Sequence, residues 1–240
     1  MGRSAQPGRG AQPDGGAPLI LFGGTFDPIH RAHLRAALAV SRRLGGAEVR
    51  LLPNAVPPHR PQPQASASHR LAMVRLACAG YSHLHADAWE LSRSGPSYTL
   101  ATLRHYRQRI GAQRPLVLLI GADSFAGLAD WHRWPEFAAL CHLAVVSRPG
   151  APTPPAKVRR AFPLAPASGL LRRPAGRRLM LKRPHLDVSS TDVRHHLLKN
   201  GRSPALTPRV RTYIRRHRLY TVPVNHPDNH LDNHPENEVS

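Results

Sequence analysis

The 240-residue sequence is short of cysteine and of long apolar runs, and each shortage excludes a class of protein. Its two cysteines, Cys78 and Cys141, each lie among apolar residues. This pattern excludes a disulfide scaffold and a cysteine-ligated metal centre, and it predicts two buried free thiols of an intracellular protein. No run of about 18 apolar residues occurs, which excludes a transmembrane helix.

Acidic and aromatic residues are also scarce. The chain has 14 Asp and Glu against 34 Lys and Arg, which gives a formal net charge of +20. Such a charge fits nucleic-acid binding, the steering of anionic small substrates into a basic cleft, or a compositional bias towards arginine. A nucleic-acid module needs aromatic stacking residues on a basic face, but aromatics make up 5% and the basic residues are scattered. The sequence therefore favours the steering of anionic small substrates together with a compositional bias towards arginine.

The length and an apolar share of 41% allow one large domain with its own core. Residues 1–17 are rich in Gly, Pro and Gln, which predicts a disordered arm rather than a signal peptide. Residues 222–240 alternate His, Asn, Asp and Pro, which predicts a disordered tail. The domain is expected over residues 18–221, in the cytoplasm. The oligomeric state is left open, and a homo-oligomer is one option.

Short apolar runs alternate with helical patterns along this domain. Such alternation predicts an α/β fold, a Rossmann-like open parallel sheet with helices on both faces. Strands are expected at residues 19–22, 48–52, 83–89, 116–120, 142–146 and 177–181. Residues 188–198 and 208–217 are expected to form a small C-terminal helical segment. Two further helices are expected to be capped by Ser68 and by Ser97 or Thr99.

One stretch organises the chain, residues 22–34 with the sequence FGGTFDPIHRAHL. Gly23 and Gly24 follow the first strand and let the backbone turn and approach a ligand closely. A helix begins after this loop, and loop amides and a helix N-terminus both favour an anion. His30 and His33 project from one face of the helix start. Two imidazoles there suit a polyphosphate, because each can donate a hydrogen bond or carry charge.

A His-x-x-His pair can also form half of a metal site, but no cysteine or carboxylate cluster lies nearby to complete one. No protein metal site is therefore expected. A second grip for phosphate is predicted where residues 189–191, Ser-Ser-Thr, open a helix that carries Arg194 one turn later. The alternative is an ordinary helix cap with Arg194 on the surface. The loop of residues 23–33, here called the phosphate loop, is a second predicted phosphate site in the same chain. Its presence favours phosphate binding at residues 189–194 over the plain helix cap.

Residues 23–33, GGTFDPIHRAH, resemble the signature of the nucleotidyltransferase superfamily, which condenses a nucleoside triphosphate with a phosphate ester. Within it, the chain from Leu19 to Tyr220 is similar to the nicotinate-nucleotide adenylyltransferases. One departure is Ala32, where that family usually carries glycine. The similar stretches occur in the family's order, at residues 53–60, 95–99, 120–123, 131, 148–150 and 188–194.

The resemblance implies transfer of an adenylyl group from ATP to nicotinate mononucleotide, which forms nicotinate adenine dinucleotide and pyrophosphate. The attacking phosphate is mostly ionised at neutral pH, so no protein base is required. The expected transition-state stabilisers, and so the catalytic residues, are His30, His33 and Arg194. Mg²⁺ is expected to arrive with ATP. The residues expected to bind ATP are Gly23, Gly24, Thr25, Phe26, His30, His33, Ser189, Ser190, Thr191 and Arg194.

The same resemblance implies the acceptor site. Trp131 would stack on the pyridine ring, and Thr99 with the backbone amide of His132 would meet the nicotinate carboxylate. Two alternatives stay open: a sibling transferase acting on nicotinamide mononucleotide or phosphopantetheine, and a basic nucleic-acid-binding protein. Trp131 and residues 96–99 argue against phosphopantetheine. The residues expected to bind the mononucleotide are Asp27, Arg60, Thr99, Asp123, Trp131, His132 and Arg148.

Overall fold

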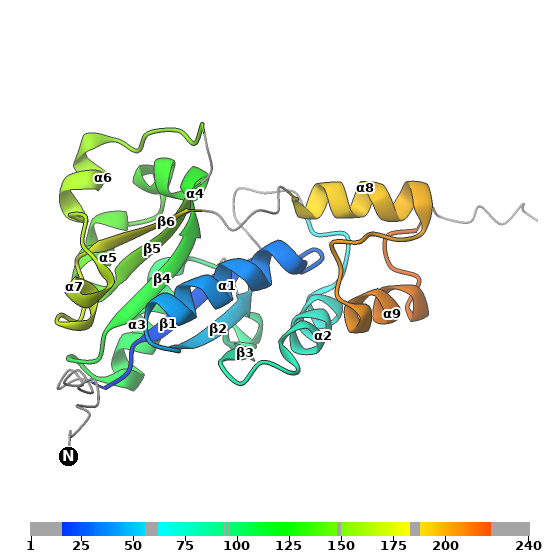
Figure 1. The fold of residues 1–240 in the computed structure, drawn as a ribbon, viewed down its shortest axis with the longest axis horizontal. Coiled ribbons are helices and arrows are strands. Elements are labelled where there is room, and N and C mark those ends of the chain that lie inside the picture. Colours follow the sequence, from blue (N-terminus) through cyan, green and yellow to red (C-terminus); the bar gives the residue numbers. More distant parts are fainter. Residues whose placement is uncertain are drawn as a thin grey trace, which may run out of the picture.

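A computed structural model describes residues 16–55, 62–93, 95, 97–147, 150–182 and 188–221. The predicted tail, all but the last two residues of the predicted arm, and the side chains of Arg60 and Arg148 lie outside these residues. Six strands form one sheet in the order β3-β2-β1-β4-β5-β6, and every neighbouring pair is parallel (Figure 1). The strands are β1 Leu19–Gly24, β2 Glu48–Pro53, β3 Leu84–Ala86, β4 Leu116–Gly121, β5 His142–Ser147 and β6 Arg178–Lys182.

Helices cover both faces of this sheet, as the sequence predicts. None of the helices among the described residues is long and apolar enough to cross a membrane. The α-helices are α1 Arg31–Arg43, α2 Ala67–Cys78, α3 Thr99–Ile110, α4 Ala122–Ala126, α5 Phe137–Leu140, α6 Ala156–Ala161, α7 Ala167–Leu171, α8 Ser190–Asn200 and α9 Pro208–Arg216. Short 3₁₀ turns lie at η1 Trp89–Ser92, η2 Leu128–Asp130 and η3 Trp134–Glu136.

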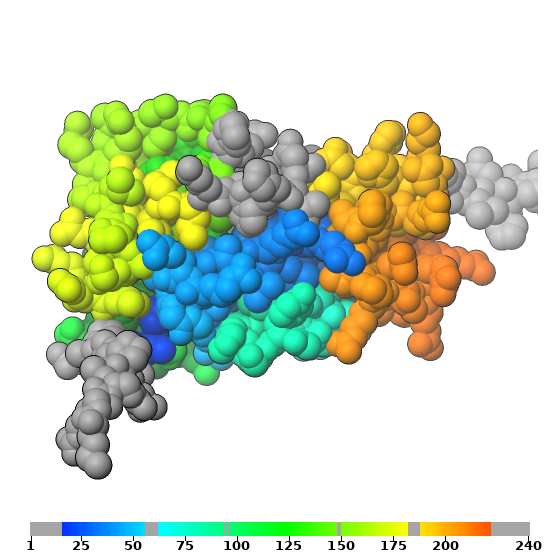
Figure 2. All heavy atoms as spheres, in the orientation of Figure 1, coloured from blue at the N-terminus to red at the C-terminus, as the bar shows by residue number. Residues whose placement is uncertain are grey.

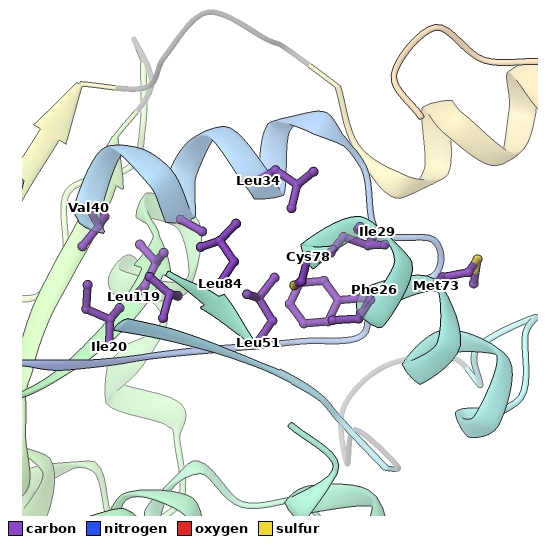
Figure 3. Packing of buried hydrophobic residues seen from close by; sticks show 14 of the residues in the cluster. Ile20, Phe26, Ile29, Leu34, Val40, Leu51, Met73, Cys78, Leu84 and Leu119 are labelled. Carbon is purple, nitrogen blue, oxygen red and sulfur yellow. The ribbon is translucent and has the colours of Figure 1, made fainter. Parts of the chain in front are cut away.

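Alternate residues of the central strands enter two separate apolar cores, because successive side chains of a strand point to opposite faces. On one face, Ile20, Val117 and Ala144 pack with buried residues of α1, α2, α7, α8 and α9. Figure 3 shows Leu34 and Val40 of α1 above this face, with Phe26 and Ile29 beside α2. The other face packs against α3, α4, α5 and α6, through residues that include Leu21, Leu118, Leu143, Leu103 and Phe137.

The chain reverses its direction of winding between β1 and β4, which are neighbours in the sheet. In open α/β sheets, the crevice outside the carboxyl ends of the strands at this point binds ligands. Gly24 ends β1 and Gly121 ends β4, so two of the loops singled out from the sequence meet at this crevice. The fold therefore positions the predicted site.

The C-terminal helices α8 and α9 pack beside the N-terminal end of α1 and beside α2 (Figures 1 and 2). The backbone amide of Arg31, the first residue of α1, donates to the carbonyl of Ala205 at 2.8 Å. On α9, Arg209 donates to the carbonyl of Ala79, after α2, at 2.9 Å. These bonds fix the segment between α8 and α9 against the start of α1, and α9 against the end of α2.

Some predicted element ends and caps are wrong. Ser66 rather than Ser68 caps α2, since its side chain accepts from the His69 amide. Helix α3 begins at Thr99 without a side-chain cap bond, and the third strand is three residues long. The structure also adds α7, which the sequence did not predict. Ser66 and Ser68 both have the short hydroxyl side chain of a cap residue, and the local bond from the His69 amide identifies Ser66 as the cap.

His142, at the start of β5, is fully buried and joins two chain segments. Its Nε2 atom lies 2.8 Å from the Arg173 carbonyl, and its Nδ1 accepts from the Arg177 amide at 3.1 Å. Since a carbonyl can only accept, the proton is on Nε2 and the ring is neutral. Burial lowers the pKa of His142 below its ordinary value.

We expect the free energy of unfolding to fall as the pH drops through about 6.5 towards the lowered pKa of His142. The sign follows because the unfolded chain binds the proton more readily, so the stabilisation is present above the unfolded pKa and lost below it. Urea unfolding between pH 7.5 and pH 5.5 would measure it. His142→Gln should flatten this slope, and the exposed His85→Gln should keep it. An unchanged slope in His142→Gln contradicts the assignment.

Candidate active site

The loop after β1 turns sharply at Phe26, which has a positive φ of 50° and is 2% exposed. A Cβ atom at Gly24 would lie 3.0 Å from the Phe26 ring, so a side chain there would have to displace the ring. The ring also packs edge-on against Phe22, with centroids 5.5 Å apart. Because its side chain lies in the core, Phe26 can meet ATP only through its backbone.

The two histidines stack at the start of α1. Their ring centroids are 3.8 Å apart, and the His30 amide donates to Nδ1 of His33 at 3.3 Å. A neutral His33 ring then carries its proton on Nε2, where it is a donor. His30 is 3% exposed, whereas His33 is half-buried. The histidines that the sequence treated alike thus differ in access, and His33 is the one better placed to meet a ligand.

The start of α8 carries a capping box. The Ser189 side chain accepts from the Asp192 amide at 3.1 Å, and the Asp192 carboxylate accepts from the Ser189 amide at 2.8 Å. Bonds from Ser189 lower the pKa of Asp192. The helix-cap interpretation of Ser189 is therefore correct, and its hydroxyl already serves the protein.

The same turn docks on the phosphate loop. The Ser190 hydroxyl donates to the carbonyl of Pro28 at 3.0 Å. Arg194 donates to the carbonyl of Asp27 at 2.7 Å and to the Thr191 hydroxyl at 3.3 Å. The surface alternative for Arg194 is wrong, because its guanidinium contacts the loop. The structure thus brings residues 190–194 together with the His30–His33 region.

The carboxylate of Asp27 is 5% exposed and surrounded by protein donors. It accepts from the amides of Gln64 at 2.9 Å and Ala65 at 3.1 Å, and from the Tyr220 hydroxyl at 2.6 Å. Nη1 of Arg194 lies 3.9 Å from its second oxygen. This buried carboxylate ties together three distant parts of the chain, whereas the sequence predicted it as a substrate contact.

A buried arginine completes this arrangement. Arg70 is 1% exposed, and its guanidinium donates to the carbonyls of Thr25 at 2.8 Å, Ala55 at 3.3 Å and Ala65 at 3.3 Å. Burial lowers its pKa, and the nearby charge of Asp27 acts in the opposite direction. Arg70 therefore holds the phosphate loop against the loop that follows β2.

A cavity of about 70 Å³ opens at the carboxyl ends of β1, β2 and β4. Thr99 and Trp131, both half-buried, lie in its wall, so the structure brings two predicted mononucleotide contacts to one pocket. Trp131 packs edge-on against Phe137, with centroids 6.2 Å apart, which fixes the indole. The polar residues that line the cavity are Asn54, Glu90, Ser97, Thr99 and Thr102.

His132 and Asp123 lie on the loops near this cavity and are exposed. The His132 ring packs at a tilt against Tyr98, with centroids 4.5 Å apart. Asp123 lies in the first turn of α4, directly after β4. Both therefore lie at the same sheet edge as Trp131, although the cavity wall does not include them.

Sequence reasoning missed three residues of this region, Arg70, Tyr220 and Glu90. For Arg70 a signal existed: the buried positions of α2 are 70, 73, 74, 77 and 78, so the helical period places Arg70 on the buried stripe. Tyr220 follows the last helix and Glu90 lies in a predicted loop. No local pattern distinguishes these two from surface residues.

A family model described as cytidylyltransferase-like matches residues 21–196 of the chain. The matched part contains the phosphate loop, the cavity and the start of α8. The chain therefore belongs to the cytidylyltransferase-like family, a class of nucleotidyltransferases.

Curated relatives narrow this class. A protein of Pseudomonas putida strain W619 is 46% identical over 208 residues, which are 85% of this chain and 94% of the relative. One from Yersinia enterocolitica is 43% identical over 209 residues, covering 83% and 94% of the two chains. Both are named "Probable nicotinate-nucleotide adenylyltransferase". Within its family this chain thus groups with the nicotinate-nucleotide adenylyltransferases.

Solved structures agree at the level of the fold. A Plasmodium falciparum nicotinic acid mononucleotide adenylyltransferase complexed with NaAD aligns with a TM-score of 0.66 at 18% identity, over 85% of this chain and 97% of that one. The same enzyme complexed with APC aligns with a TM-score of 0.62 at 17% identity, with the same coverage. These likenesses support the Rossmann-like sheet.

Removal of the Tyr220 hydroxyl should destabilise the protein by about 1–3 kcal/mol, because a buried carboxylate loses a donor. The melting temperature of Tyr220→Phe should fall by roughly 2–10 °C. Tyr81→Phe is the matched control, since Tyr81 is 40% exposed. Equal melting temperatures for the two variants would show that the Asp27–Tyr220 bond does not stabilise the fold.

Proposed function

We propose an assignment of residues to the reaction that family membership gives this chain. The enzyme transfers the adenylyl group of ATP to nicotinate mononucleotide. A phosphate oxygen of the mononucleotide forms a bond to the α-phosphorus of ATP, and the bond from that phosphorus to the bridging oxygen of pyrophosphate breaks. The products are nicotinate adenine dinucleotide and pyrophosphate.

The protein takes no covalent part in this reaction as proposed. The attacking phosphate carries its negative charge at neutral pH, since its second pKa is about 6. The protein must hold two anionic reactants in line and stabilise the charge that develops as pyrophosphate leaves. The histidine, arginine and hydroxyl groups gathered beside the phosphate loop have the chemistry for that role.

On the ATP side, we assign the Nε2–H group of His33 and the guanidinium of Arg194 as donors to the phosphates. Support comes from the half-buried position of His33 and from the docking of Arg194 on the loop. His30 is assigned to set the orientation of His33, because their rings stack and its amide bonds Nδ1. The remaining predicted contacts are the loop from Gly23 to Phe26, through its backbone, and Ser189, Ser190 and Thr191.

On the acceptor side, Trp131 is assigned to stack on the pyridine ring, and the Thr99 hydroxyl to meet the nicotinate carboxylate. Their shared cavity supports both assignments. The amide of His132 and the side chain of Asp123 are proposed as neighbours of the mononucleotide. Family resemblance alone supports the remaining contacts, Asp27, Arg60 and Arg148.

Mg²⁺ is proposed to arrive on the triphosphate, where it would neutralise charge on the phosphates. The donors beside the loop fit that form of binding, since His33, Arg194 and Ser190 recognise phosphate oxygens. The buried carboxylate nearest to them, Asp27, already accepts bonds from three protein donors. Among the described residues, no group of three or more His, Cys, Asp or Glu is arranged to hold a metal ion.

We place the enzyme in a reducing compartment, the cytoplasm. Both cysteines are free and buried, and burial raises the pKa of the Cys78 thiol to about 12. Such thiols are inert, and their survival as thiols fits a reducing environment.

Pyrophosphate release from ATP tests the proposed function. The assay should use nicotinate mononucleotide, nicotinamide mononucleotide and phosphopantetheine as acceptors, with the dinucleotide identified by mass. Nicotinate mononucleotide should be the best acceptor. Faster release with phosphopantetheine would overturn the proposal in favour of a sibling transferase.

His33→Ala should lower kcat by roughly 10²-fold, because it removes a preorganised donor to developing charge. Steady-state kinetics at saturating ATP measures this. His85→Ala is the control, because His85 is an exposed histidine on the edge strand β3. Near-normal turnover of a folded His33→Ala enzyme would show that His33 does not stabilise the developing charge.

The acid mononucleotide should exceed the amide in kcat/KM by roughly 10- to 10³-fold. The proposed site offers donors, and an amide would set its own NH₂ against one of them, which leaves a group unsatisfied. Trp131→Ala should weaken both substrates alike, because stacking does not discriminate between the rings. Equal kcat/KM values for acid and amide would show that these donors do not face the carboxylate.

A further inference from the structure

Glu90 is a buried carboxyl group in the wall of the acceptor cavity, and the reaction as described gives it no role. It lies in η1 between β3 and α3, and it is 7% exposed. Burial raises its pKa, and the charges of Arg93 and Asp87 nearby act in opposite directions on it. A carboxyl group is costly to bury, so its hydrogen-bond partners show what it does.

Those partners join Glu90 to the start of α3. The buried Thr102 hydroxyl donates to Oε1 of Glu90 at 2.7 Å, and the nearby Ser97 side chain lowers the pKa of Glu90. Thr99 lies between these two residues in the sequence, at the first position of α3. A hydrogen bond to Glu90 therefore fixes the turn of α3 that begins at Thr99.

A further bond, made by Ser97, anchors the start of α3 to the sheet. The Ser97 oxygen accepts from the backbone amide of Ala55 at 3.0 Å, and Ala55 follows β2. The first turn of α3 is thus fixed relative to the strand ends at which the cavity opens.

We propose that Glu90 is a positioning residue for recognition of the acceptor: through its bond to Thr102 it fixes the first turn of α3, and with it the Thr99 hydroxyl, where the nicotinate carboxylate binds. The inference rests on the proposed function and deepens it. Glu90 does not touch the reacting phosphates, so its loss acts on the mononucleotide site and leaves the ATP site intact.

Thr102→Val tests this, because valine keeps the shape of threonine and loses the hydroxyl. The KM for nicotinate mononucleotide should rise about tenfold, while the KM for ATP and kcat stay within about twofold. The preference for acid over amide should fall by a similar factor, because the donor at Thr99 is displaced. Thr102→Ser restores the hydroxyl and should recover most of the wild-type KM.

Glu90→Leu examines the other end of the bond. Its side chain has no oxygen that could accept from the Thr102 hydroxyl, so the KM for the mononucleotide should again rise about tenfold. The double variant with Thr102→Val should be no worse than either single variant, since both remove one interaction. Ser41→Ala is the matched control: it removes a buried hydroxyl bond to the Ala47 carbonyl, remote from the cavity, and should leave both KM values unchanged.

Two results would overturn the proposal. One is an unchanged KM and acid preference in folded Thr102→Val, and the other is an equal rise in the KM for ATP, which would indicate general loosening. Melting curves and turnover of the wild type with nicotinate mononucleotide come first. A wild type that does not use this substrate refutes the proposed function itself, so the two failures are distinguishable.

Discussion

The site depends on one buried carboxylate, that of Asp27. A carboxylate at 5% exposure is stable only when donors or positive charges surround it. Its donors come from the loop before α2 and from Tyr220, and Arg194 forms an ion pair with it at 3.9 Å. Satisfying this one group therefore requires the C-terminal helices to close on the phosphate loop. The protein makes these contacts itself, so the groups that would meet the triphosphate are arranged before any ligand arrives.

Arg70 extends the same constraint to the cavity proposed to hold the acceptor. It bonds the carbonyl of Thr25 in the phosphate loop and that of Ala55 after β2, while the amide of Ala55 bonds Ser97 beside the acceptor cavity. Both halves of the site are thus attached to a common set of backbone groups at the carboxyl ends of β1 and β2. For a reaction that relies on in-line placement of two anions, a rigid separation between the halves is what the protein must supply.

The sequence was sufficient for the features with a local pattern. Continuous apolar runs predicted β1, β4 and β5, and the strand-glycine-helix order predicted where His30 and His33 would lie. The sequence was insufficient where contacts between distant parts of the chain determine what a residue does. Asp27 was assigned to the mononucleotide by family resemblance, and no local pattern announces its protein partners, which lie up to 193 positions away. Phe26 was predicted as an ATP contact, and the packing of its ring in the core close to Gly24 leaves only its backbone for that role. Arg70 lay on a detectable buried stripe, but a charged residue there gives no sign of which carbonyls it meets.

The central claim is direct, in-line transfer of the adenylyl group between two substrates that the protein only positions. The most direct measurement uses ATP made chiral at the α-phosphorus with sulfur and determines the configuration of the dinucleotide product. A single displacement inverts the configuration, and inversion is the result that this account predicts. Retention would mean two displacements, through an adenylyl group carried on the protein, with His33 the first residue to suspect.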